Sequence, residues 1–502
     1  MDRLSIAFIT PEAVPFAKTG GLADISGVLP SILSKLGQEV RVLLPLYRQI
    51  REPFGQELER QAEFTVKVGD KSFRGALLCL QQRKKNKDAE FYFIEEDEFF
   101  DRDGLYGDPS TGLDFHDNAE RFIFFCRAAV QCLEKRGWKP DIIHLNDWQT
   151  ALVAPFVRID LSDSSPLRKS KVVFTIHNLA YQGQFDAKEY CKLGLPESYF
   201  AVTGPFEFWG KVNFMKAALH FSDHITTVSP TYAREIISSS EYGMGLEGVL
   251  ASRANNLSGI LNGVDYKIWS PKVDKLIPFR YFPANLSGKK KNKLELVRNA
   301  GFPIRVDSPL FGMISRLDNQ KGLDLIMEIF DRMMSLDLQF ILLGTGDPKY
   351  MQFFRQKQQE SPDKFKAYLE FDNQMAHLIE AGADIFLMPS RYEPSGLNQM
   401  YSLKYGTVPL VRKTGGLADS VEDFDPEKKT GTGLVFEKYD ADALLATIER
   451  GVRLYSRKKL WYKLMKAGMS QDFSWEKVAT KYLDLYRQLV DENGFGNAGK
   501  VV

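Results

Sequence analysis

The sequence has little that could span a membrane or coat an anionic surface. Its 502 residues contain no run of about 18 apolar residues, so we expect no membrane span. The 66 Lys and Arg residues nearly balance the 65 Asp and Glu residues, and the formal net charge is +1. Proteins that work mainly by coating nucleic acid or membranes normally carry a large basic excess. We therefore expect neither partner, and any anion site must be local.

Cysteine and histidine are also scarce, with 4 and 6 residues, and their spacing fits no metal site. No HExxH, GxSxG or Walker lysine motif occurs. Residues 1–10 are too short for a secretory apolar region and lack a small-residue cleavage site. We therefore expect a cytoplasmic protein without bound metal, whose reduced thiols are Cys79, Cys126, Cys132 and Cys191.

What the sequence does contain is an alternation of short apolar runs with longer helical stretches. Leu4–Thr10 is predicted to form a buried strand, and Leu22–Leu36 a helix that stops at Gly37. Glu39–Leu44 is the next strand, and this order is typical of a parallel sheet. The polar segment Gln81–Glu90 is expected to form a hairpin tip. Further strands are predicted at Ile142–Leu145, Val172–Ile176 and Ile225–Val228.

The middle of the chain has a different character. Residues 266–308 contain several prolines, and we expect a linker with a solvated surface loop that holds Lys289, Lys290, Lys291 and Lys293. A second strand–helix series then follows. Its strands are predicted at Leu310–Ile314, Gln339–Leu343, Tyr368–Phe371, Ile385–Met388 and Val408–Val411. The sequence thus predicts an α/β protein with two doubly wound domains in tandem.

One seven-residue motif, KTGGLAD, occurs twice, at Lys18–Asp24 and at Lys413–Asp419. Each copy follows a predicted strand and leads into a helical pattern. Paired glycines before a helix leave backbone N–H groups at the positive end of the helix dipole, and a ligand can approach them closely. We therefore predict two anion-binding helix starts, one in each domain.

Ligands of open α/β sheets bind beyond the carboxyl ends of the strands. Lys18, Arg316 and Lys321 follow predicted strands, and such cations suit a diphosphate. Gly322 then opens a helix that could hold the same group. A second polar set could bind sugar hydroxyls, and its members are Asp147, His177 and Glu393. We infer one site in a cleft between two domains.

Several longer motifs, in this order, resemble those of bacterial glycogen synthases and plant starch synthases. In the first half they are Lys18–Leu22 (KTGGL), His144–Trp148 (HLNDW), Thr175–Asn178 (TIHN) and Leu261–Asp265 (LNGVD). In the second half they are Ser315–Gly322 (SRLDNQKG), Glu393–Gln399 (EPSGLNQ), Thr414–Asp419 (TGGLAD) and Phe473–Trp475 (FSW). The resemblance covers nearly the whole chain.

The resemblance implies a GT-B fold, with two Rossmann-like domains that face each other across a cleft. Residues 1–265 would form the acceptor-side domain and residues 266–472 the domain that binds the nucleotide sugar. Residues 473–502 would form a tail whose helix, at Trp475–Leu489, returns to the first domain. The implied reaction moves glucose from ADP-glucose to the non-reducing end of an α-1,4-glucan such as glycogen, with retention of configuration. No cofactor is implied.

The resemblance also implies residue roles. Lys18 would contact the nucleotide sugar, while Arg316 and Lys321 would hold the diphosphate. Asp147 and His177 would lie near the transferred sugar. Glu393 would bind glucose hydroxyls. The other expected substrate contacts are Gly20, Gly21, Asp24, Asn178, Asn262, Ser395, Gly396, Leu397, Thr414, Gly415 and Gly416.

Three positions depart from the family's usual pattern. The family more often has histidine at Asn146, cysteine at Ser395 and threonine at Asn398. No residue that contacts the nucleotide base can be identified, so UDP-glucose is the alternative donor. The motifs also leave open a phosphorylase that carries pyridoxal phosphate on the same fold, and a weakly active glucan-binding protein.

Overall fold

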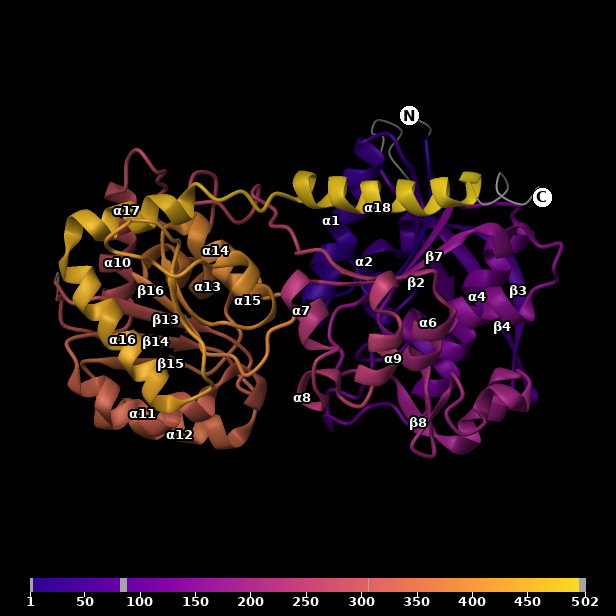
Figure 1. Ribbon diagram of the computed structural model, residues 1–502, viewed down its shortest axis with the longest axis horizontal. Helices are drawn as coiled ribbons and strands as arrows, with labels where there is room; N and C mark the ends of the chain where they lie inside the picture. The colour runs from indigo at the N-terminus through magenta and orange to yellow at the C-terminus, as the bar shows by residue number, and fades with distance from the viewer. Residues whose placement is uncertain (1–2, 82–87, 306, 496–502) are drawn as a thin grey trace, which may run out of the picture. The chain divides into compact units, whose positions relative to one another are not determined.

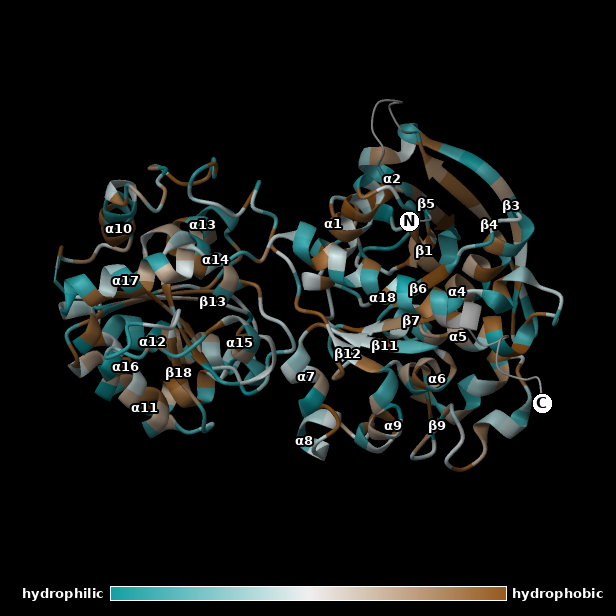
Figure 2. Cartoon of the chain, turned by 45° about the horizontal axis from the view of Figure 1, so that its top comes forward, coloured by the Kyte–Doolittle hydropathy of each residue, from teal (hydrophilic) through white to brown (hydrophobic). Residues whose placement is uncertain are grey.

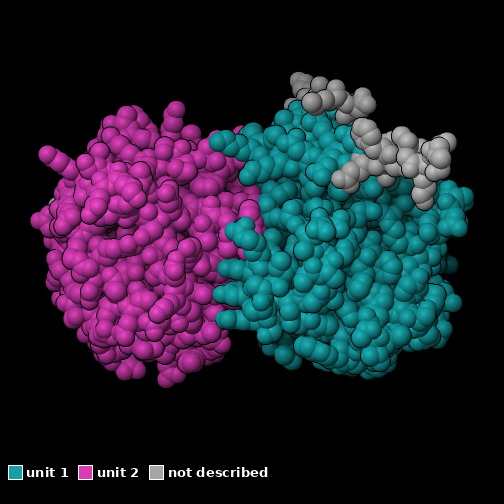
Figure 3. All heavy atoms as spheres, viewed as in Figure 1, with its two compact units in different colours: residues 1–228, 233–260, 475–502 teal, residues 229–232, 261–474 magenta. Residues whose placement is uncertain are grey.

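The computed structural model describes residues 3–81, 88–305 and 307–495. The chain divides into two compact units (Figure 3). Unit 1 comprises residues 1–228, 233–260 and 475–502, and unit 2 comprises residues 229–232 and 261–474. Apart from the short segment 229–232, the chain passes between the units after residues 260 and 474, where the sequence suggested boundaries at 265 and 472.

Unit 1 is built on a nine-stranded sheet with the order β12-β11-β7-β6-β1-β2-β5-β4-β3. All of its strand pairs are parallel except those that β4 makes with β3 and β5. The strands are β1 (Ser5–Ile9), β2 (Glu39–Pro45), β3 (Leu58–Val68), β4 (Lys71–Leu80), β5 (Glu90–Glu95), β6 (Ile142–Asn146), β7 (Lys171–Ile176), β11 (His224–Thr227) and β12 (Leu257–Gly259). The longer helices are α1 (Gly21–Lys35), α4 (Asn118–Lys135), α6 (Phe214–Phe221) and α18 (Trp475–Phe495).

Unit 2 has a six-stranded parallel sheet with the order β15-β14-β13-β16-β17-β18 (Figure 1). The strands are β13 (Leu310–Ile314), β14 (Gln339–Leu343), β15 (Phe365–Tyr368), β16 (Ile385–Met388), β17 (Val408–Arg412) and β18 (Leu434–Phe436). The helices are α10 (Ser287–Asn299), α11 (Leu323–Ser335), α12 (Pro348–Glu360), α13 (Asn373–Gly382), α14 (Asn398–Tyr405), α15 (Gly415–Ser420), α16 (Ala441–Ser456) and α17 (Lys458–Met469). With the two parallel sheets, this confirms the predicted α/β class.

The strands of unit 2 are apolar along their whole length because both faces of the sheet are covered. Phe311, Met313 and Leu342 belong to one hydrophobic cluster. Their alternate neighbours Leu310 and Ile341 belong to another. Figure 2 shows the central strands of this unit in brown, the hydrophobic end of its scale.

Two of the expectations for unit 2 were wrong. The run Lys289–Lys293 is not in a solvated loop but lies in α10, where Lys289 is buried. Tertiary contacts account for this, since the Lys289 ammonium donates to Thr407 Oγ1 at 2.7 Å. The strand expected at Tyr368–Phe371 is β15, which ends at Tyr368, because its pairing with β14 begins at Phe365.

Unit 1 contains strands that the apolar pattern did not reveal. The long antiparallel pair of β3 and β4 was missed, as was a small sheet of β8 (Gln184–Asp186), β9 (Glu207–Phe208) and β10 (Lys211–Asn213). The antiparallel pairing of β4 with β5 fits the expected hairpin, but residues 82–87 of its tip lie outside the described residues.

The C-terminal helix α18 packs on unit 1, beside α1, as predicted (Figure 1). Its Tyr486 is fully buried and its hydroxyl lies 2.5 Å from His144 Nδ1 in β6. The other ring nitrogen of His144 lies 2.6 Å from Thr175 Oγ1 in β7. Helix α18 therefore supports the two strands that end at Asn146 and just before His177.

We expect Tyr486→Phe to lower the free energy of unfolding of unit 1 by about 1–3 kcal/mol, because it leaves a buried imidazole nitrogen unpaired. Denaturant unfolding followed by circular dichroism measures this loss. Lys481→Gln, at an exposed position of the same helix, is the control and should leave the unfolding midpoint unchanged.

Candidate active site

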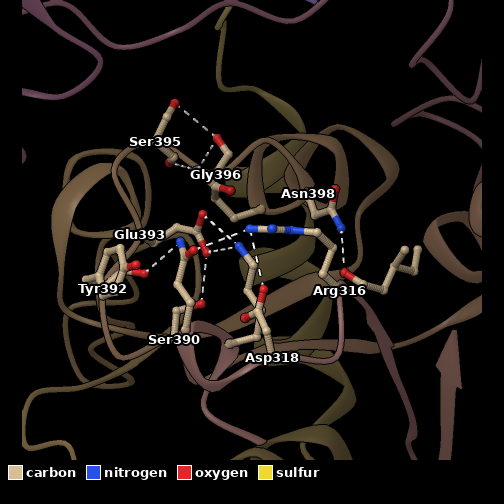
Figure 4. Close-up of polar contacts among 12 residues, drawn as sticks. Arg316, Asp318, Ser390, Tyr392, Glu393, Ser395, Gly396 and Asn398 are labelled. Carbon is tan, nitrogen blue, oxygen red and sulfur yellow. Dashed lines mark hydrogen bonds and ion pairs between the residues drawn. The ribbon is translucent and has the colours of Figure 1, made fainter. Parts of the chain in front are cut away.

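In unit 2, a buried ion pair joins the segments that follow β13 and β16 (Figure 4). Lys321 Nζ lies 3.0 and 2.8 Å from the two carboxylate oxygens of Glu393. The Ser390 hydroxyl donates to the same carboxylate at 2.9 Å. Only 17% of the Lys321 side chain and 7% of the Glu393 side chain are exposed. The pair thus places two fixed charges at the carboxyl edge of the sheet.

Glycines let the backbone close tightly around this pair. Gly322 has φ +70°, and a Cβ there would lie 2.0 Å from the carbonyl oxygen of Pro389. Gly415 has φ +42°, and a Cβ there would lie 2.0 Å from the carbonyl oxygen of Glu393. Only glycine fits such positions without a backbone shift. Both loops therefore depend on glycine to bring Lys321 and Glu393 together.

Arg316 lies beside the pair and is more exposed than either of its members. Its side chain is 57% exposed, and Figure 4 shows it directed toward the Glu393 loop. Its contacts with Asp318, at 3.5 Å, and with Gln320, at 3.4 Å, are long. An exposed guanidinium at this edge of the sheet has the geometry to bind an anion such as a phosphate.

In unit 1, one carboxylate organises the loop between β1 and α1. Glu12 is buried and accepts bonds from the Thr19 N–H at 2.6 Å, the Thr19 hydroxyl at 2.6 Å and the Tyr106 hydroxyl at 2.7 Å. Beyond this anchor, the exposed Lys18 ammonium pairs with Asp24 at 2.8 Å. Lys18 is thus presented at the surface of a loop whose base is fixed.

The two KTGGLAD copies have different structural roles. In the first copy, an added Cβ at Gly20 would meet nothing within 4 Å, although the Gly20 N–H donates to the Glu12 carboxylate at 3.3 Å. In the second copy, the Gly416 N–H donates to the Glu393 carbonyl at 3.0 Å, so it is not available to an anion. Asp419 accepts bonds from Ser229 and Thr231 instead of pairing with a lysine. The two copies thus have different surroundings, and the two anion-binding helix starts stay a prediction.

Asp147 and His177 meet where β6 and β7 end. The Asp147 carboxylate accepts the His177 N–H at 2.8 Å, and Asp147 adopts φ +56°, which is rare for a residue other than glycine. His177 Nε2 lies 3.0 Å from the side-chain oxygen of Asn146. The Asn146 amide nitrogen already donates to the Ile9 carbonyl, so its oxygen must accept from His177. This fixes the hydrogen of the imidazole on Nε2.

The other imidazole nitrogen, Nδ1 of His177, is buried and has no hydrogen-bond partner among the described residues. Burial lowers the pKa of His177 to about 3, so the ring is neutral near pH 7. Nδ1 is then an acceptor, and an unpaired buried acceptor is unfavourable unless a ligand donates to it. A sugar hydroxyl has the required chemistry.

The remaining predicted residues lie in the same loops. Asn178 accepts the Ala180 N–H in the turn after β7. Gly396, with φ +66°, lies between Ser395 and Leu397 just before α14. Thr414 precedes α15, and Asn262 is buried in the segment where unit 2 begins. Gly21 is the first residue of α1.

Sequence reasoning missed two residues that shape these loops and one exposed ring, and it named Asn146 only as a departure from the family pattern. Glu12 and Ser390 anchor the Lys18 loop and the Glu393 carboxylate, and Asn146 orients His177. Phe371 follows β15 at the carboxyl edge of the sheet and is 90% exposed. Glu12 follows the predicted strand Leu4–Thr10, and that position could have identified it, whereas Phe371 had been assigned to the end of a predicted strand.

Among the described residues, no group of three His, Cys, Asp or Glu side chains could hold a metal ion. The same residues include no helix long and apolar enough to cross a membrane.

Known proteins match the whole chain. Residues 5–252 match the model of the starch synthase catalytic domain, and residues 299–463 match that of group 1 glycosyl transferases. A glycogen synthase from Thermotoga petrophila is 42% identical over 495 residues, which are 98% of this chain and 100% of the relative. The chain belongs to the glycogen and starch synthase family. A second glycogen synthase, from Anaeromyxobacter, is 45% identical over 487 residues, or 97% of this chain and 99% of the relative.

Solved structures agree with this family membership. The catalytic domain of starch synthase IV from Arabidopsis thaliana, bound to ADP and acarbose, has a TM-score of 0.87 at 34% identity. The match covers 98% of this chain and 100% of that one. A sucrose-phosphate synthase from Thermosynechococcus elongatus, at 19% identity and a TM-score of 0.60, shares the fold. The protein is thus a glycosyltransferase with the GT-B fold that its motifs predicted.

The repeated motif offers a matched pair of substitutions within its glycine pair. We expect Gly20→Ala to leave stability unchanged, because the site is open and φ is −148°. We expect Gly415→Ala to cost about 2–4 kcal/mol, because a Cβ adds a backbone clash to a left-handed φ. Equal unfolding midpoints for the two variants would contradict the different roles of the two copies.

The buried Asp147 predicts a pH-dependent stability. Burial raises the pKa of Asp147 from the usual 3.8 to about 7. At pH values between these two, the folded protein keeps a proton that the unfolded chain has released. The free energy of unfolding therefore falls as the pH rises from about 4 to about 8. Asp147→Asn cannot ionise, and we expect it to gain stability relative to the wild type between about pH 4 and about pH 8. Unfolding curves that differ by a constant amount at every pH would contradict this.

Proposed function

We propose that the protein transfers glucose from ADP-glucose to the non-reducing end of an α-1,4-glucan, with retention of configuration. The observation that carries the proposal is the arrangement of Arg316, Lys321 and Glu393 at one edge of the unit 2 sheet, in a chain of the glycogen and starch synthase family. ADP as the leaving group is supported by the starch synthase IV structure, which is bound to ADP. An α-glucan acceptor is supported by the glycogen synthase relatives. We also propose a cytoplasmic location.

The unit 2 loops would hold the donor. The diphosphate becomes more negative as its bond to the glucosyl carbon breaks, and cations already in place stabilise that charge. Arg316 would turn from its long contacts onto the diphosphate, and Lys321 would share its ammonium between Glu393 and the phosphate. The Glu393 carboxylate would then accept hydrogen bonds from glucose hydroxyls.

The unit 1 loops would contact the transferred glucose. His177 Nδ1 would accept a hydrogen bond from a sugar hydroxyl, while Asn146 keeps the imidazole hydrogen on the other nitrogen. Asp147 is protonated for much of the time near pH 7, because its pKa is about 7. A protonated carboxyl group is a poor nucleophile, so we propose that Asp147 positions the His177 loop and forms no covalent intermediate.

The direct test is to incubate the protein with ADP-glucose or UDP-glucose and a maltooligosaccharide. We expect release of ADP, with little UDP, and an elongated product whose new linkage is α-1,4 by proton NMR. A β-linked product would refute retention. Faster release of UDP would reassign the donor, and no transfer from either donor would refute the proposal.

Arg316 tests the diphosphate role, because its side chain is 57% exposed and its removal leaves no cavity in the core. We expect Arg316→Ala to lower turnover at least tenfold, and about 10²-fold if it supplies a typical ~3 kcal/mol to the transition state. Arg332→Ala is the control, since Arg332 is 60% exposed and pairs on the surface with Asp442. Steady-state rates of ADP release decide the matter, and equal rates for the two variants would exclude this role.

Phe371 is a candidate for binding the nucleotide base, because its exposed ring follows β15 at the sheet edge that carries Arg316. Stacking of a base on an aromatic ring contributes about 1–3 kcal/mol. We expect Phe371→Ala to raise KM for ADP-glucose at least fivefold with little change in kcat. Phe282→Ala, at a position that is 47% exposed, should leave both parameters unchanged. A lower kcat at constant KM would argue against base stacking.

A further inference from the structure

Unit 2 contains a cavity between α10 and α17, which lie side by side in Figures 1 and 2. Its volume is about 370 Å³, within the range of small-molecule sites. Asp384, which lines it, directly precedes β16, whereas Glu393 follows that strand. The cavity therefore lies at the amino edge of the sheet, opposite the edge that carries Arg316 and Lys321.

The cavity has more positive than negative charge. Five basic side chains line it, Lys289, Lys290, Lys293, Arg305 and Lys458, against the two acids Asp307 and Asp384. Asp384 is already used, because Lys293 Nζ lies 2.6 Å from its carboxylate. Among the described residues, no carboxylate lies within 4 Å of the ammonium groups of Lys290 or Lys458. Within that part of the chain, these two exposed lysines are cations without a matching anion.

The lysines also lie where a helix disfavours them. Lys289 and Lys290 are in the first turn of α10, and Lys458 is the first residue of α17. Neither helix has an acidic residue in its first turn. Because the amino end of a helix is its positive pole, cations there are unfavourable and an anion is favoured. Both helix starts line the same cavity, so one anion could relieve the repulsion at both.

The electrostatic surroundings of Lys458 also favour an anion in the cavity. Partial burial lowers the pKa of Lys458 from its usual value. The positive charges of Lys293 and Lys290 add to this lowering, while Asp384 and Asp307 oppose it. A bound anion would stabilise the charged form of Lys458.

The walls suit a ligand with a body larger than the anion itself. Leu294, Val297 and Met465 supply apolar surface, and Tyr455 and Tyr462 supply rings. The Lys458 ammonium lies 3.4 Å from the centre of the Tyr455 ring. The Lys290 ammonium lies 5.9 Å from the centre of the Tyr462 ring. The two cations are thus held over aromatic faces, beside room for a compact organic group.

We propose that this cavity is a second ligand site, which binds a small organic phosphate, with the phosphate on Lys290 and Lys458 and the organic body against the apolar and aromatic wall. The site is independent of the glucosyl-transfer site, since it shares no residue with it. Lysine suits phosphate as a compact point charge with three donors.

The test is isothermal titration calorimetry of the full chain with ribose 5-phosphate, inorganic phosphate and ribose. The Lys290→Gln, Lys458→Gln double variant removes both phosphate ligands. The Lys291→Gln, Lys463→Gln double variant removes one exposed charge from each of the same two helices without touching the cavity. Arg316→Ala reports on the glucosyl-transfer site.

We expect ribose 5-phosphate to bind the wild type, the Lys291/Lys463 variant and Arg316→Ala with equal affinity. The Lys290/Lys458 variant should bind at least tenfold more weakly while keeping its unfolding temperature, and ribose should not bind. Equal affinity in the Lys290/Lys458 variant, no binding by the wild type at millimolar ligand, or loss of binding in Arg316→Ala would overturn the proposal. Inorganic phosphate that binds as tightly as ribose 5-phosphate would overturn the organic part.

Discussion

The buried ion pair of Lys321 with Glu393 is the interaction on which the candidate site of unit 2 depends. Burying two charges is unfavourable unless the pair has good geometry and its remaining atoms are hydrogen-bonded. Here both carboxylate oxygens contact the ammonium, and Ser390 donates to one of them. Gly322 and Gly415 allow the backbone approach that this geometry needs. The need for glycine at these two positions is thus a consequence of this one ion pair.

In unit 1, a loop is likewise fixed around a buried charged side chain. A buried carboxylate, Glu12, binds backbone and hydroxyl groups, and so fixes the loop without a buried cation. The His177 ring is also fixed, because its Nε2 donates to the Asn146 side-chain oxygen. Its buried Nδ1 is left to accept a hydrogen bond from a ligand. Helix α18 supports this arrangement through Tyr486 and His144. Each unit therefore holds one polar side chain in a fixed orientation, Glu393 in unit 2 and His177 in unit 1.

The sequence predicted the parts of this account that depend on local order. Strands ended where apolar runs ended, and Arg316, Lys321, Asp147 and His177 follow those ends, so parallel-sheet logic placed them at the correct edges. The prediction from sequence failed where contacts between distant residues determine the environment of a side chain. Lys289 reads as a solvated lysine, yet its bond to Thr407, 118 residues away, draws it into the core. Identical KTGGLAD letters also hid two environments, because only the second copy packs against the Glu393 loop.

We infer that the Lys321–Glu393 pair serves donor binding rather than stability. The most direct measurement compares the double variant Lys321→Met, Glu393→Leu with the wild type, in denaturant unfolding and in transfer from ADP-glucose. Replacing a buried pair by apolar residues of similar volume is often neutral or stabilising. We expect unchanged or higher stability of the double variant, together with loss of most turnover. A variant that loses stability by about 3 kcal/mol or more, or one that transfers glucose at the wild-type rate, would contradict it.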